Sequence, residues 1–125
     1  MAVSVCHTLI FFIGLAVLKL SGPNIALYGS KITLTCRITH TDQGISKKYN
    51  PDKIEWYQNG YRVKSSTMRI INMALVDSQT ATSSLTIPSV FPQDSGAWIC
   101  LERGEKGVNG IIDVKAYDKI LLEVV

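Results

Sequence analysis

Two cysteines in separate strand-like segments restrict how this chain can fold. Along Lys31–Thr39, apolar residues and Cys36 occupy every second position, with polar residues between them, which is the period of a half-buried strand. Cys100 lies at an inward position of a second predicted strand, Gly96–Glu102. A disulfide between Cys36 and Cys100 would therefore join two sheets across one core.

The third cysteine, Cys6, lies in an N-terminal stretch that contains an uncharged apolar run, Leu9–Leu18. The run is too short to span a bilayer and is typical of a secretory signal peptide, so we expect residues 1–22 to be removed. No Lys or Arg precedes the run, and the candidate cleavage sites lie near Ala16 or between Ser21 and Asn24. The alternative is a buried first strand or helix.

A secreted chain that loses Cys6 keeps an even pair, Cys36 and Cys100, which predicts one disulfide. Zinc ligation by these two cysteines and His40 is the alternative. His40 stands alone, because the one other histidine, His7, lies in the N-terminal stretch. We therefore expect no metal and no cofactor, and the absence of a second long apolar run predicts no membrane span.

The remaining residues, 23–125, form short strand-like segments separated by turn residues, in a chain long enough for one core and too short for two. Besides the two cysteine segments, the expected strands are Lys53–Gln58, Thr82–Ile87 and Tyr117–Val125, and Asn59-Gly60 predicts a tight turn after the first of these. Short strands at this spacing favour an all-β sandwich.

Five elements of the sequence, in order, resemble an immunoglobulin superfamily domain: Cys36, Trp56, Leu85-x-Ile87, Asp94-x-Gly96 and Cys100. The resemblance covers roughly residues 24–125 and is closest to the intermediate and variable subtypes. It implies an all-β, immunoglobulin-like Greek-key sandwich of two antiparallel sheets. It also implies that Trp56, Leu85 and Trp98 lie in the core.

Trp98 departs from the family pattern, which has a tyrosine two residues before the second cysteine. In the family this tyrosine donates its hydroxyl to the upstream main chain. The indole N–H is also a donor, but we expect that it cannot make the same hydrogen bond from its wider ring. The resemblance further implies an ion pair between Asp94 and Arg69; the alternative is a solvated Arg69 and an Asp94 that caps a turn.

The last predicted hairpin contains a conflict of register. Val108–Ile111 reads apolar-Asn-Gly-apolar, a two-residue turn signal, and counting back from it places Lys119 opposite Cys100, in the core. Shifting the register of the two strands by one residue turns each side chain to the other face of the sheet. We therefore predict a β-bulge or irregular loop between Arg103 and Tyr117 that turns Ile120, Leu122 and Val124 inward.

No arrangement of residues predicts catalysis, because no serine has a plausible base and no carboxylates pair in apolar surroundings. The net charge of +3 does not indicate nucleic-acid binding. We predict a secreted binding module for protein–protein recognition or cell adhesion. Its partner is an extracellular or cell-surface protein, a second copy of the chain being one candidate.

Two alternatives to this function remain. One is an ectodomain fragment or soluble splice form of a larger adhesion receptor. The other is an intracellular structural module of the muscle type, against which the N-terminal apolar run argues.

Two long loops, 40–52 and 103–116, lie at the same end of the sandwich in this fold, where recognition residues are often placed. The tip of the second loop, with apolar residues that the core cannot reach, predicts a partner-binding patch; alternatively, it folds back over Tyr49. The next candidate is the flat sheet with Tyr57, Gln58 and Tyr61. The predicted partner-binding residues of the loops are Lys47, Lys48, Tyr49, Val108, Ile111 and Ile112.

Overall fold

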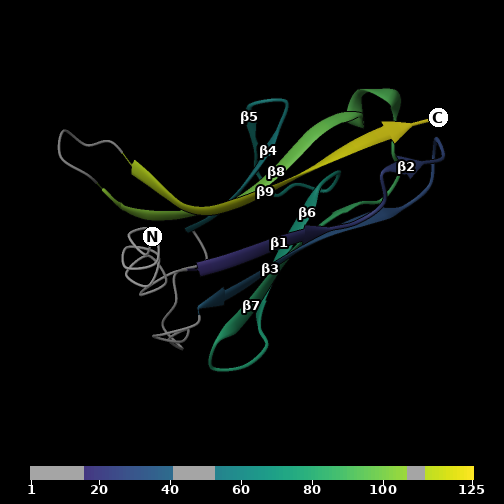
Figure 1. The fold of residues 1–125 in the computed structure, drawn as a ribbon. Coiled ribbons are helices and arrows are strands. Elements are labelled where there is room, and N and C mark those ends of the chain that lie inside the picture. Colours follow the sequence, from purple (N-terminus) through teal and green to yellow (C-terminus); the bar gives the residue numbers. More distant parts are fainter. Residues whose placement is uncertain (1–15, 41–52, 107–111) are drawn as a thin grey trace, which may run out of the picture.

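The computed structural model describes residues 16–40, 53–106 and 112–125, which form two β-sheets that lie face to face (Figure 1). The four-stranded sheet has the order β1 (Ala16–Ser21), β3 (Ile32–His40), β7 (Thr80–Ile87) and β6 (Ile70–Leu75). The five-stranded sheet has the order β2 (Ile25–Ala26), β9 (Ile112–Val124), β8 (Gly96–Lys106), β4 (Ile54–Gln58) and β5 (Tyr61–Val63). Neighbouring strands are antiparallel except β2 and β9, which are parallel. The predicted two-sheet, all-β sandwich is confirmed.

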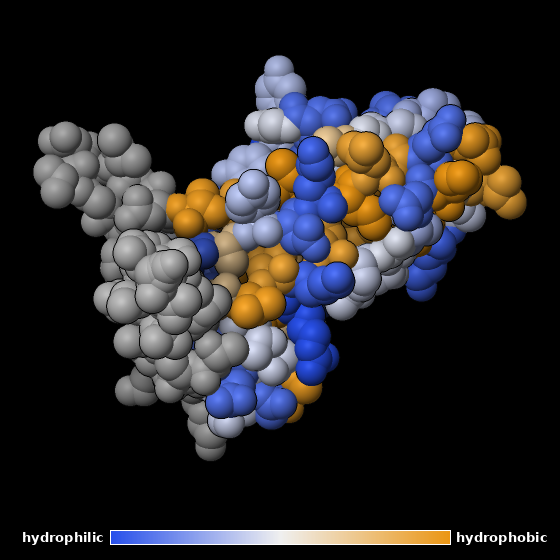
Figure 2. Space-filling model, in the orientation of Figure 1, coloured by the Kyte–Doolittle hydropathy of each residue, from blue (hydrophilic) through white to orange (hydrophobic). Residues whose placement is uncertain are grey.

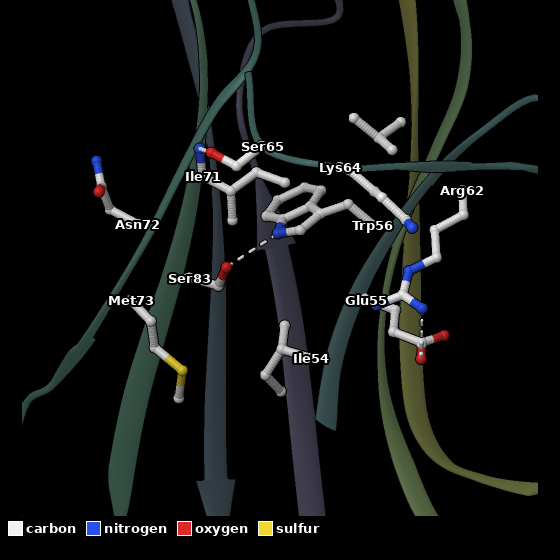
Figure 3. A pocket seen from close by; sticks show the side chains of 11 residues that line it. Ile54, Glu55, Trp56, Arg62, Lys64, Ser65, Ile71, Asn72, Met73 and Ser83 are labelled. Carbon is white, nitrogen blue, oxygen red and sulfur yellow. Dashed lines mark hydrogen bonds and ion pairs between the residues drawn. The ribbon is translucent and has the colours of Figure 1, made fainter. Parts of the chain in front are cut away.

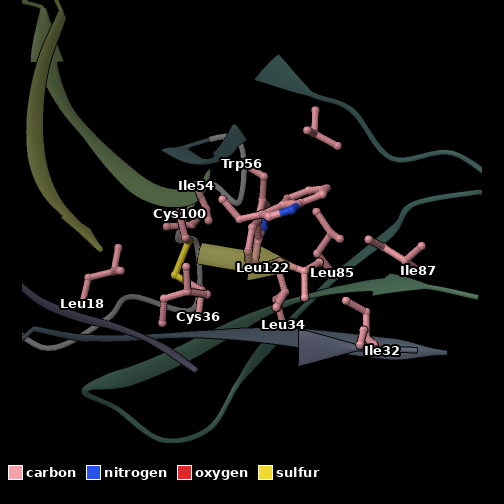
Figure 4. Packing of buried hydrophobic residues seen from close by; sticks show 14 of the residues in the cluster. Leu18, Ile32, Leu34, Cys36, Ile54, Trp56, Leu85, Ile87, Cys100 and Leu122 are labelled. Carbon is pink, nitrogen blue, oxygen red and sulfur yellow. A yellow bond between two sulfur atoms is a disulfide. The ribbon is translucent and has the colours of Figure 1, made fainter. Parts of the chain in front are cut away.

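The core lies between the sheets and surrounds the disulfide of Cys36 in β3 and Cys100 in β8 (Figure 4). The Cα atoms of the two cysteines are 6.4 Å apart, and the predicted pairing is confirmed. Trp56 from β4 is buried beside the disulfide, and its indole N–H donates to Ser83 Oγ at 2.9 Å. Leu85, expected in the core, is fully buried on β7.

The N-terminal part of the described chain contributes to both sheets. β1 pairs with β3 from Ala16 opposite His40 to Ser21 opposite Thr35, and its alternate residues Ala16, Leu18 and Leu20 are buried. The chain then crosses to the other sheet, where β2 pairs with β9. Residues 16–21 thus form the first strand that we kept as the alternative for the apolar run, while the signal peptide over residues 1–22 stays a prediction.

The hairpin of β8 and β9 has the register shift that the sequence predicts. Cys100 lies opposite Asp118, not Lys119, and irregularities follow on either side of Arg103. As a result Ile120 and Val124 pack against the core and Leu122 is buried within it. The bulge is confirmed, and Asp118 is accommodated because its Oδ2 accepts the Leu20 N–H at 2.8 Å.

The tight turn at Asn59-Gly60 joins β4 to β5, with positive φ angles of 50° and 86°. Such angles define the hairpin turn for which Asn-Gly is the favoured pair. The Asn59 side chain accepts the Ala97 N–H at 2.9 Å. Glycine is favoured at position 96 beside it, because its φ of 129° is rarely adopted by residues with a side chain, and a Cβ there would also press against the Asn59 amide.

The corner before β8 is closed by Trp98, which is fully buried. Its Nε1 donates to the main-chain oxygen of Asp94 at 2.9 Å. The expectation that the indole cannot make the tyrosine's type of bond is therefore wrong: the ring reaches an upstream carbonyl four residues away. Arg69 Nη2 lies 2.8 Å from Asp94 Oδ1, and the Arg69 guanidinium lies 5.1 Å from the centre of the Trp98 ring.

His40 has a buried acidic partner that the sequence did not predict. Its Nε2 lies 3.0 and 2.9 Å from the two carboxylate oxygens of Glu102, and both side chains are buried. His40 follows Cys36 on the inward face of β3, and Glu102 follows Cys100 on the inward face of β8. The two polar groups meet because each sheet turns one inward near the same end of the sandwich.

Candidate protein-binding face

The outer surface of the five-stranded sheet carries apolar side chains at its centre. Because Trp98 and Cys100 of β8 are buried, the alternation of a strand turns Ala97, Ile99 and Leu101 to the opposite side. Both sides of β8 are therefore apolar. A strand that is apolar on both sides, in a sheet with only one covered face, leaves apolar area available to a partner.

β9 extends this apolar area to one side. Tyr117 lies opposite Leu101 and Leu121 lies opposite Ala97, and their side chains are 67% and 60% exposed. Lys119 lies between them, opposite Ile99. On the other side of β8, Tyr57 of β4 lies opposite Ile99. We call this surface the outer face, and its residues are Tyr57, Ala97, Ile99, Leu101, Tyr117, Lys119 and Leu121 together with the charged cluster described next.

A charged cluster borders the apolar centre around Glu55 of β4. Its carboxylate is buried beneath Arg103, whose Nε lies 3.0 Å away, and Arg62, whose Nη1 lies 3.5 Å away. The Tyr57 hydroxyl donates to Glu55 Oε1 at 2.7 Å. This hydrogen bond to Glu55 and, next, burial raise the pKa of Tyr57 above its ordinary value, so the phenol stays neutral.

The charge balance of the outer face is positive. Arg62, Arg103 and Lys119 supply three basic groups, Glu55 supplies one acidic group that is almost fully covered, and Glu123 adds one exposed acidic group beyond Leu121 at the end of β9. A surface with an apolar centre and basic groups around it is complementary to a protein surface with acidic groups around an apolar centre.

The opposite side of the sandwich has a different chemistry. The outward positions of β3 and β7 are mostly hydroxyl side chains, and Thr33 and Thr86 bond to each other across the strands at 3.1 Å. In the view of Figure 2, which has the orientation of Figure 1, hydrophobic surface is interspersed with hydrophilic residues. This hydrophobic surface extends to the end of the molecule where β2 and the C-terminus lie. The hydroxyl-rich surface has little apolar area to offer a partner, so the outer face is the better candidate site. The outward hydroxyl residues are Thr33, Thr35, Thr39, Thr82, Ser84 and Thr86.

Most of the predicted partner-binding residues fall outside the described residues, and these remain predictions: Lys47, Lys48, Tyr49, Val108 and Ile111. Ile112 begins β9, and its role also stays a prediction. Of the second candidate group, Tyr57 lies on the outer face and Tyr61 is 81% exposed at the adjoining turn. Gln58 instead points inward, where its amide donates to the Gln93 and Ser95 carbonyls.

The contribution of β8 and β9 to this face was not predicted from the sequence. The signal was present: if Cys100 points inward, then Ile99 and Leu101 must point outward. The Glu55 cluster had no comparable signal, because Arg62 and Arg103 reach Glu55 from strands on either side of β4.

The described residues show neither a metal site nor a membrane helix. Among them, no three His, Cys, Asp or Glu side chains gather as they do around an ion. In the same part of the chain no helix is long and apolar enough to cross a membrane.

Two sheets joined by a buried disulfide, with a tryptophan packed beside it and an aromatic corner, define an immunoglobulin-like sandwich. The chain belongs to the immunoglobulin domain family, whose profile matches residues 17–103. Domains of this family serve protein recognition and adhesion and are in general not catalytic. A search of curated proteins finds no match to the sequence.

Many solved structures resemble the fold, including the following two. The crystal structure of Dpr2 Ig1-Ig2 in complex with DIP-Theta Ig1-Ig3 matches with a TM-score of 0.60 at 19% identity, over 89% of this chain and 50% of that one. A chimeric titin Z1Z2-Z1Z2 tandem matches with a TM-score of 0.56 at 20% identity, over 86% and 47%. The chain thus spans about half the length of the solved chains that it resembles.

Proposed function

We propose that this chain is a secreted, non-catalytic recognition module that binds an extracellular or cell-surface protein through the outer face. The observation that carries the proposal is the exposed apolar area of β8 and β9 bordered by Arg62, Arg103 and Lys119. Large, rigid side chains such as those of Tyr57 and Tyr117 are favoured at binding surfaces because they bury much area at little entropic cost.

The disulfide supports an extracellular location, because such bonds persist in oxidising compartments. The Dpr2–DIP-Theta structure, a complex between chains of immunoglobulin domains, supports a protein as the partner class. From the charge of the outer face, the partner surface carries acidic groups around an apolar centre.

The test compares two double variants of the purified, tagged domain in binding to native cell surfaces by flow cytometry. Tyr117→Ser with Leu121→Ser removes two exposed side chains of the outer face. Leu27→Ser with Tyr28→Ser removes the same residue types, with similar exposure, from the segment after β2. We expect the first variant to lose at least ten-fold in apparent affinity, which corresponds to about 1.4 kcal/mol, and the control to bind normally. Equal binding by both variants would reject the outer face as the site.

The receptor-fragment alternative also has an observation in its favour, since the chain matches only half of each solved tandem. Under this alternative the same domain is one unit of a longer adhesion receptor. Sequencing of the transcript in both directions decides between them: further immunoglobulin exons or a membrane segment would support the receptor.

A further inference from the structure

The edge strands of the two sheets differ in how they resist pairing with another chain. β2 and β5, which border the five-stranded sheet, have only two and three residues. In the four-stranded sheet, β1 carries Lys19 on its exposed side, and a lysine on an edge discourages pairing. β6, at the other border, has six residues and no charge.

The backbone of β6 presents hydrogen-bonding groups to the outside of the sheet. The Val76 N–H donates to the Thr80 carbonyl at 2.9 Å. In an antiparallel pair, the backbone N–H and C=O groups of residues 70, 72, 74 and 76 therefore point toward β7, and those of the residues between them point outward from the sheet edge. The Ile71 N–H confirms this alternation, because it turns away from β7 and donates to Ser65 Oγ at 3.0 Å. Within the described part of the chain, no strand pairs with the outward groups of Met73 and Leu75.

The sandwich is open beside this edge. A pocket of about 410 Å³ lies between β5 and β6 and is lined by Trp56, Val63, Ile71 and Met73, among others. Figure 3 shows Ile71 turned toward Trp56, Met73 on the same side of β6, and Asn72 turned the other way. A strand added to β6 would therefore continue the four-stranded sheet past the pocket without displacing a described strand.

The composition of this edge favours a second copy of the chain as the added strand. Ile70–Val76 contains no charge, and like charges are the main obstacle to pairing identical strands. Arg69 and Asp77 flank the run, so an antiparallel copy brings a basic end toward an acidic end at both sides. Leu75 and Val76 are 47% and 52% exposed, and pairing would cover them.

We propose that two copies of this chain associate through antiparallel pairing of β6 with β6, which forms one continuous eight-stranded sheet. Met73 of each copy lies opposite Leu75 of the other, and Ala74 lies on the two-fold axis opposite itself. This register uses the outward groups of Met73 and Leu75 and keeps the Ser65–Ile71 bond. The small Ala74 side chain lets the strands approach at the axis. The surface is modest, so the association is weak and depends on concentration.

The register is tested by cysteine cross-linking. Ala74 and its copy form a non-hydrogen-bonded pair with Cα atoms about 4.5 Å apart, within the range of about 4.4–6.8 Å that a disulfide spans. The Ala74→Cys variant should become a covalent dimer under mild oxidation, as seen by non-reducing electrophoresis. Asn72→Cys is the matched control: its two copies lie roughly 14 Å apart at about 3.4 Å per residue, so it should stay monomeric. Equal cross-linking of both variants, or of Asn72→Cys alone, would overturn this register.

The association itself is tested by sedimentation of the purified domain over a hundred-fold range of concentration. We expect the weight-average mass to rise toward that of a dimer in the wild type. Ala74→Lys, which places two like charges at the axis, should remain monomeric, whereas Thr35→Lys, on the same sheet but away from the edge, should dimerise. If Ala74→Lys does not fold, Leu75→Pro replaces it, because it removes only an outward N–H. A wild type that is monomeric throughout, or equal loss in both lysine variants, would overturn the proposal.

The two binding proposals fail independently, because β6 and the outer face belong to different sheets. Tyr117→Ser with Leu121→Ser should still dimerise, and Ala74→Lys should still bind a partner at the outer face.

Discussion

Trp98 shows how one residue can replace another at a corner of the fold. The indole is fully buried and donates to the Asp94 carbonyl. We predict that Trp98→Ala destabilises the domain by about 3–5 kcal/mol. Trp98→Phe, which removes the donor and some area, should cost about 1–3 kcal/mol. Trp98→Tyr should cost least, since its hydroxyl suits the family's geometry. Urea unfolding of the three variants measures the order, and equal stability of the Phe and Tyr variants would mean that the hydrogen bond contributes nothing.

His40 and Glu102 give a second prediction at the scale of single residues. The Glu102 carboxylate is 1% exposed, and His40 contacts both its oxygens. Losing a buried hydrogen bond to a charged group typically costs about 1.5–3 kcal/mol, so we expect His40→Ala to destabilise by about that amount. His40→Leu combined with Glu102→Leu should cost less than either single change. A double-mutant cycle by urea unfolding checks this, and additive effects would show that the pair is not coupled.

The two clusters differ in how far the sequence predicts them. Asp94 and Arg69 occupy positions that the family pattern marks, and they form the expected contact. His40 and Glu102 occupy inward positions past each cysteine, but they come from opposite sheets. Whether two such strands cross at the same level depends on sheet packing, which alternation along one strand does not contain.

Among the strands, β1 bears on where the mature chain begins. Leu18 and Leu20 belong to the core, and the Leu20 N–H bonds to Asp118, so cleavage after Ser21 would remove them. Gly14 and Ala16 supply the small residues that a cleavage site after Ala16 needs. We therefore predict that a secreted chain begins at Val17 and keeps most of β1. N-terminal sequencing of secreted protein measures this, and a start between residues 22 and 25 would contradict it.

The sequence predicted β3, β4, β7 and β9 from a period of two or a turn signal beside them, and β8 from the family pattern of Asp94, Gly96 and Cys100. β2 and β5 are too short to show a period. β1 begins within the apolar run, and β6 is apolar at most positions, so neither shows a clear alternation along its own length. The outer face was missed for a related reason: β8 is apolar on both sides, so its pattern does not distinguish the core from a binding surface.

At the scale of the whole molecule, the Cys36–Cys100 bond is the one disulfide between the sheets in the described residues, and its cysteines are 64 residues apart in sequence. In the chain-entropy model, closing such a loop stabilises by about 4 kcal/mol, chiefly by restricting the unfolded chain. Against a typical domain stability of about 5–15 kcal/mol, its loss would leave a marginal fold.

We predict that Cys36→Ala with Cys100→Ala lowers the free energy of unfolding by about 2–5 kcal/mol in urea. The slope of the free energy of unfolding against urea concentration distinguishes an effect of the bond on the unfolded state from an effect on the native packing. If the bond acts through the unfolded state, its removal lets that state expand and expose more surface, and the slope should rise. A loss of stability with an unchanged slope would instead place the effect in the native packing around Trp56, which lies beside the sulfurs (Figure 4). A loss below about 1 kcal/mol would contradict both accounts, because neither a freed loop nor a cavity beside Trp56 is that small an effect.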